Sequence, residues 1–118
     1  MADFPVRISF KNMDHSDALE NAVQEKIDTM AKHFDRISEC AVVIEAPHKH
    51  GHKSRIYQVR ITMGVSGTKI AVNKGHANKD QSHEDPYIAV RDAFNAATRQ
   101  LEDFSRKIRG DVKAHVAS

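Results

Sequence analysis

The segment YQVRITMGVSGTKIAVN, residues 57–73, carries the strongest secondary-structure signal in the chain. Its first half alternates apolar and polar side chains, which is the period of two that a strand with one buried face shows. Ser66-Gly67 then offers residues typical of a tight turn, and the same alternation resumes after it. The segment predicts a β-hairpin whose buried face is formed by Tyr57, Val59, Ile61, Met63, Ile70 and Val72.

Two more strands are predicted before this hairpin. Residues 4–11 alternate in the same way, with Val6, Ile8 and Phe10 on one side. Residues 40–45 form an apolar run that is rich in β-branched side chains and too short for a buried helix. Both stretches are therefore expected to join the hairpin in one sheet.

Two amphipathic helices complete the predicted set of elements. One spans about residues 17–34, and Ser16 is suited to cap its first turn. The other begins at Asp85-Pro86, where a favoured N-cap residue precedes the proline that suits the first helical position. The basic residues of its last turn and Gly110 predict that it ends there.

The predicted order of elements, β-α-β-β-β-α, indicates an α+β fold. A sheet with one apolar face and two amphipathic helices bury one another if both helices pack on that face, which gives a two-layer sandwich with a four-stranded sheet. A chain of 118 residues suits one domain. That domain is predicted over residues 1–110, with a flexible C-terminal tail over residues 111–118.

Composition and cysteine usage exclude several classes of protein. Apolar residues make up 40% and charged residues 29% of the chain, a balance that argues against disorder. No apolar run approaches the roughly 18 to 20 residues that a membrane span requires, and the first residues do not resemble a secretory leader. We therefore expect a cytoplasmic protein with no membrane partner. Cys40 lies within an apolar run and is predicted to be a structural core residue rather than a nucleophile.

Positive charge is predicted to gather beside the apolar face of each helix. At about 100° per residue, the arginines of the second helix form a strip, and lysines with a histidine flank the first helix. If the helices lie side by side, the two flanks border a groove suited to phosphate groups. The alternative is that these are ordinary solvated helix surfaces, because acidic residues lie on the same helices. The proposed RNA-binding residues are Lys26, Lys32, Arg36, Arg91, Arg99, Arg106 and Arg109, with His33 beside them, and Arg7, Lys11, Arg60 and Lys69 are expected on the exposed face of the sheet.

Three short motifs, in this order of elements, resemble those of a known family. They are His33-Phe34-Asp35-Arg36-Ile37 at the end of the first helix, and Tyr87-x-Ala89-Val90 and Arg99-Gln100-Leu101 in the second. The chain resembles the short form of the ribosome hibernation-promoting factor family, also called ribosome-associated inhibitor or protein Y, from about Val6 to Arg109.

The resemblance implies both a fold and a mode of action. It implies the β-α-β-β-β-α fold and binding to small-subunit rRNA in the channel of messenger and transfer RNA, which inhibits translation under stress or in stationary phase. It assigns basic positions of the family to Arg99, Lys26 and Arg36. Where family members often carry lysines, this chain departs from the pattern with Ala96, Asp103 and Ser105. Without the C-terminal dimerisation domain of the long family members, the protein is expected to be a monomer when it is off the ribosome.

Two other binding functions and an enzymatic activity are the alternatives to ribosome binding. Five histidines in two polar segments suggest a metal site, although no recognised ligand spacing is present. They are His48, His50, His52, His76 and His83. A different double-stranded-RNA-binding module is the other alternative. Helix capping explains Glu84 and Asp85, and no catalytic motif is present, so we predict no enzyme activity, no cofactor and no metal.

Overall fold

The computed structural model describes residues 3–47, 56–74 and 85–117. Its elements follow the predicted β-α-β-β-β-α order. They are β1 (Val6–Lys11), α1 (Asp17–His33), β2 (Ile37–Glu45), β3 (Gln58–Val65), β4 (Thr68–Lys74) and α2 (Pro86–Ala117).

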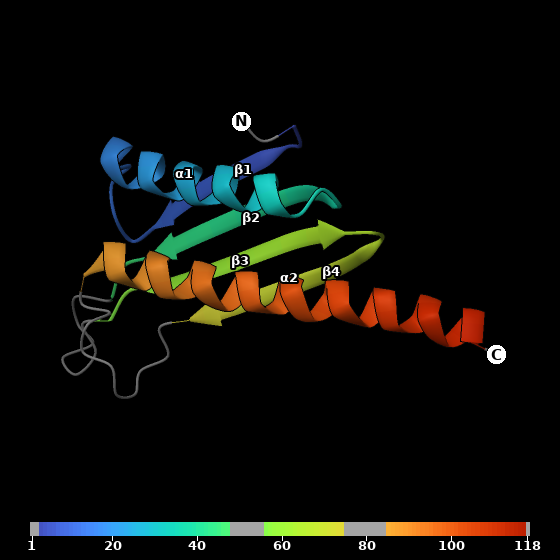
Figure 1. Ribbon diagram of the computed structural model, residues 1–118. Helices are drawn as coiled ribbons and strands as arrows, with labels where there is room; N and C mark the ends of the chain where they lie inside the picture. The colour runs from blue at the N-terminus through green and yellow to red at the C-terminus, as the bar shows by residue number, and fades with distance from the viewer. Residues whose placement is uncertain (1–2, 48–55, 75–84, 118) are drawn as a thin grey trace.

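The four strands form one mixed sheet in the order β1-β2-β3-β4 (Figure 1). β1 and β2 run parallel, and α1 supplies the crossover that a parallel pair requires. β3 pairs antiparallel with β2 and with β4. The β3–β4 turn places Ser66 at φ 49° and Gly67 at φ 79°, as a two-residue turn between twisted strands demands.

Both helices pack on the same face of the sheet, α1 in front of β1 and β2, and α2 in front of β3 and β4 (Figure 1). The buried layer between them holds the apolar side chains that the alternation predicted, and Ile61, Val59 and Val23 are fully buried. Burying each such side chain contributes roughly 1.5–3 kcal/mol relative to leaving it exposed. The predicted two-layer α+β sandwich is confirmed.

Capping residues begin both helices as the sequence predicted. The backbone N–H of Leu19 donates to Ser16 Oγ at 3.2 Å, and the backbone N–H of Tyr87 donates to Asp85 Oδ1 at 2.9 Å. Each bond satisfies a backbone donor that has no partner within the helix.

The end of α2 differs from the prediction, because the helix continues through Gly110 to Ala117. One glycine within a helix costs only about 1 kcal/mol relative to alanine, and no proline follows to stop the chain. The C-terminal half of α2 extends past the end of the sheet (Figure 1). No helix in the described ranges combines the length and apolar character that a membrane span needs.

Candidate nucleic-acid interface

The outer surface of the two helices carries most of the predicted RNA-binding residues. Six of the seven have exposed side chains: Lys26, Lys32, Arg36, Arg91, Arg99 and Arg106. The seventh, Arg109, lies in α2, but its side chain falls outside the part of the chain whose side chains the structure describes. Exposure leaves the six groups available to a polyanion.

A hollow of about 250 Å³ lies where the end of α1 meets α2. Its apolar wall includes Phe34 and Phe104, and His33 and Arg36 border it. An adjoining hollow is also lined by His33 and Phe34 and adds Arg106 from α2. The structure therefore brings Arg36, which follows α1, and Arg106 of α2 to two adjoining hollows that share His33, and Asp35 and Glu102 also line these hollows.

Lys32 borders a different hollow. Its neighbours there are Asp3 and Phe4, which precede β1, and Asp28 on α1. The predicted flank of α1 is thus divided, with His33 toward α2 and Lys32 toward the N-terminal segment. The single groove expected from the helical angles does not include Lys32.

Acidic neighbours engage two of the four arginines on α2. Arg91 donates to Asp92 Oδ1 at 3.1 and 3.2 Å, and Arg106 lies 3.3 Å from Asp103 Oδ1. The Arg106–Asp103 pair is largely exposed, and exposed pairs contribute roughly 0–1 kcal/mol, so it offers little resistance to a competing phosphate. In the other pair, Asp92 is 25% exposed. A second group makes no ion pair with any described residue: Lys26, Lys32, Arg36 and Arg99.

The open face of the sheet is a second basic surface. Its exposed cations, expected from the strand alternation, are Arg7, Lys11, Arg60 and Lys69. Because both helices lie on the other face, no described element covers these side chains.

Cys40 lies in the apolar layer and is 2% exposed. Burial raises the pKa of its thiol to about 12, so the thiolate that nucleophilic chemistry needs is disfavoured at neutral pH. The structural role predicted for this cysteine agrees with its position.

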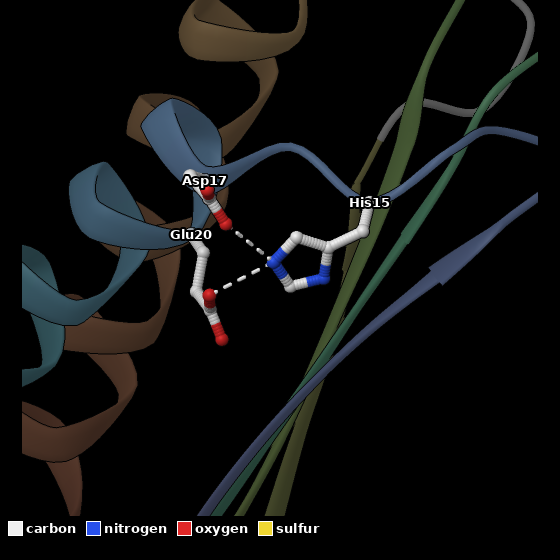
Figure 2. Close-up of side chains that lie close together, drawn as sticks. All are labelled: His15, Asp17 and Glu20. Atoms are coloured by element: carbon white, nitrogen blue, oxygen red, sulfur yellow. Dashed lines mark hydrogen bonds and ion pairs between the residues drawn. The ribbon is translucent and has the colours of Figure 1, made fainter.

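A cluster that the sequence analysis missed stands at the start of α1 (Figure 2). His15 Nε2 lies 3.0 Å from Asp17 Oδ1 and 3.0 Å from Glu20 Oε1, and the His15 ring meets Phe10 edge-on with centroids 5.0 Å apart. Both carboxylates lie in the first helical turn, where the helix dipole favours negative charge, and both are within hydrogen-bond distance of His15 Nε2. The spacing His-x-Asp-x-x-Glu across a helix start was the available signal.

Helix capping and ion pairing thus account for this cluster. Asp17 is 91% exposed, which is the setting of a solvated surface group. The histidines that suggested a metal site, at 48, 50, 52, 76 and 83, lie outside the described residues.

Comparison with known proteins gives consistent matches. The model of the family described as Sigma 54 modulation protein / S30EA ribosomal protein matches residues 6–109. The chain is 31% identical over 96 residues to the ribosome hibernation promoting factor of Azotobacter vinelandii, covering 81% of this chain and 78% of that protein.

Two solved structures share the fold. The N-terminal domain of Thermus thermophilus Protein Y matches with a TM-score of 0.64 at 19% identity, over 88% of this chain and 99% of that one. A ribosomal subunit interface protein from Coxiella burnetii matches with a TM-score of 0.66 at 15% identity, over 87% of this chain and 99% of that one. At these identities the two structures support the architecture alone.

Proposed function

Because the chain belongs to the Sigma 54 modulation protein / S30EA ribosomal protein family, we propose that it is a ribosome hibernation factor that binds small-subunit rRNA. It occupies the channel of messenger and transfer RNA and inhibits translation by excluding them. We place this action in the cytoplasm. No step of the mechanism makes or breaks a covalent bond, so the protein acts by occupying the channel rather than by catalysis.

The observation that carries the proposal is that basic side chains from near the end of α1 and from α2 lie at two adjoining hollows. Arg36, just after α1, borders one and Arg106 on α2 borders the other, with His33 common to both. Arginine binds phosphate oxygens in bidentate fashion, so guanidinium groups at two neighbouring hollows suit a sharply bent or folded RNA backbone.

The half-buried rings of Phe34 and Phe104 give this hollow an apolar wall beside its charged rim. Single-stranded and looped RNA presents unstacked bases next to phosphates, and aromatic side chains with neighbouring cations match both parts. Looped or single-stranded RNA therefore fits this surface better than a regular duplex does.

Charge reversal on α2 tests the proposal. The double variant Arg99→Glu, Arg106→Glu is expected to abolish co-sedimentation with small subunits at near-physiological salt, because each reversal replaces attraction to phosphate by repulsion. Both side chains are exposed, so circular dichroism and the melting temperature are expected to stay close to those of the parent protein.

A matched control comes from the same helix. Lys107 is also exposed, about 100° around the helix from Arg106, and Lys107→Glu changes the charge as much as Arg99→Glu does. We expect the Lys107 variant to bind several-fold better than the Arg99 variant. Unchanged sedimentation of the folded double variant refutes the assigned face.

A further inference from the structure

The face of the sheet opposite the helices arranges its basic side chains differently from the helix surface. In the register of the sheet, Arg7 on β1 aligns with Ala41, which aligns with Thr62 on β3. Gly64 aligns with Lys69 on β4. Small residues thus occupy part of the middle of this face, between Arg7 on β1 and Lys69 on β4, while Arg60 stands on the central strand β3.

A hollow of about 300 Å³ lies on this face between β1 and β4. Arg7 and Lys69 line it on either side, and Ala41 and Thr62 form part of its floor, while Glu39 also borders it. The Thr62 hydroxyl adds a hydrogen-bonding group between the two cations. The dimensions and the donors suit an anionic group that approaches the sheet from outside.

The cations of this face differ from those of α2 in their ion pairing. Neither Arg7, Arg60 nor Lys69 makes an ion pair with a described residue, in contrast to Arg91 and Arg106 on α2. The acid that comes nearest the hollow, Glu39, lies against Gly64, where an added Cβ would stand 3.0 Å from Glu39 Cγ. Unpaired guanidinium groups in solvent gain most from a phosphate, because no internal partner has to be given up.

The chemistry of this face favours RNA over a second copy of the chain. Among the described residues, the exposed large apolar side chain is Tyr87 on α2, so the open sheet face offers no apolar patch of the kind that a stable protein interface buries at its centre. Two arginines and two lysines against Glu39 and Glu45 leave a net positive charge here. This complements a phosphodiester backbone.

We propose that the open sheet face is a second rRNA-binding surface, which contacts a phosphodiester backbone through Arg7, Arg60 and Lys69 while the helices contact another segment. The inference rests on the proposed function. It adds that two RNA segments hold the domain between them, one at the helix surface and one at the open sheet face.

The experiment measures the affinity of the full chain for purified small subunits over a series of potassium chloride concentrations. The double variant Arg7→Glu, Arg60→Glu is expected to bind at least about 10-fold more weakly near 0.1 M salt. The slope of log K against log salt is expected to become shallower by about 1.5, since each lost phosphate contact removes about 0.7–0.9.

A charge-conserving variant separates phosphate contact from loss of structure. Arg7→Lys, Arg60→Lys keeps both positive charges, so its slope is expected to stay within error of the parent while affinity falls only a few-fold. Melting temperature measured on every variant confirms that the sheet is intact.

Three outcomes are informative. Weaker binding and a shallower slope for both the sheet-face and the helix-face reversals support the inference. An unchanged affinity and slope for the sheet-face reversal, with loss of binding for Arg99→Glu, Arg106→Glu, overturns the second surface and leaves the proposed function standing. Unchanged binding by both reversals overturns the two proposals together.

Discussion

The helix surface carries more cations than the open sheet face, and the two surfaces also present them differently. On α2, Arg91 and Arg106 pair with acids on their own helix, at 3.1 and 3.3 Å. On the sheet, Arg7 and Arg60 align with the neutral residues Ala41 and Val43, Glu39 and Glu45 lie on the same face, and neither arginine pairs with a described residue. The helix surface has a hollow with an aromatic wall, whereas the hollow of the sheet face has small residues in its floor.

The difference follows from the secondary structure itself. On a helix, residues three or four apart are neighbours, so acids interspersed with arginines meet them as a matter of geometry. In a strand, side chains alternate between faces, and every second residue of β3 is committed to the core. One layer of the sandwich therefore offers partly paired cations around a hollow with an aromatic wall, and the other offers cations that pair with no described residue beside a hollow floored by small residues.

Stability should depend on the two faces of one strand very unequally. Ile61 is fully buried beneath the helices, and its neighbour Thr62 points to the open face. Ile61→Ala is expected to lower the free energy of unfolding by about 3 kcal/mol, because it removes buried methyl groups and leaves a cavity. Thr62→Ala is expected to cost less than about 1 kcal/mol. Urea unfolding followed by circular dichroism measures both, and similar losses would contradict the assignment of faces.

Thiol reactivity also tests the difference between the buried and the open face of β2. Cys40 faces the core, and Ala41 beside it faces the open side, near Arg7 and Lys69. In the parent protein, labelling by a disulfide reagent at pH 8 is expected to be on the order of 100-fold slower than in the Cys40→Ala, Ala41→Cys variant, because burial disfavours the thiolate and nearby cations favour it. Equal rates in urea show that the difference belongs to the fold.

The raised pKa of Cys40 also gives a sign for the dependence of stability on pH. The unfolded thiol ionises near 9.0, whereas the folded thiol stays neutral up to about 12. The unfolded chain therefore loses its proton first, and the stability contributed by the neutral buried thiol, complete below pH 9, falls as pH rises through this window. Comparing urea midpoints of the parent and Cys40→Ala proteins at pH 8 and pH 10 isolates this contribution, and a parent that gains stability relative to the variant at pH 10 contradicts it.

The smallest expected effect concerns the acids that distinguish the helix surface. The double variant Asp92→Asn, Asp103→Asn neutralises the acids that pair with Arg91 and Arg106. It is expected to strengthen binding to small subunits about threefold to tenfold, because the arginines then have no internal ion pair to give up when they bind phosphate. Asp14→Asn, Glu25→Gln removes the same charge at exposed positions that pair with no described residue. Weaker binding by the first variant alone would mean that the ion pairs hold the arginines in a binding position.

The sequence predicted the fold because its local signals agreed with one another. Alternation in residues 57–73, the caps at Ser16 and Asp85, and the apolar arc of each helix all indicate the same sandwich. The predicted end of α2 was wrong because a single glycine is a weak stop signal, and the surrounding residues decide whether the helix continues through it.

The candidate site was less accessible to sequence reasoning. Helical angles placed Lys32 and His33 on one flank of α1, but angles do not show which neighbour a flank faces, and the two side chains border different hollows. The pairing of Arg106 with Asp103 depends on side-chain conformation. The His15 cluster forms only when the residue before the N-cap folds back onto the first helical turn.

Under the proposed function, this domain and the substrates of translation exclude each other on the small subunit. A displacement experiment adds the protein in increasing amounts to small subunits that carry labelled messenger RNA and peptidyl-site transfer RNA, and follows all three in the sedimented particles. Transfer RNA is expected to leave in proportion to the protein that binds, and Arg99→Glu, Arg106→Glu is expected to displace none. Particles that retain the protein, messenger RNA and transfer RNA together would contradict the proposed function.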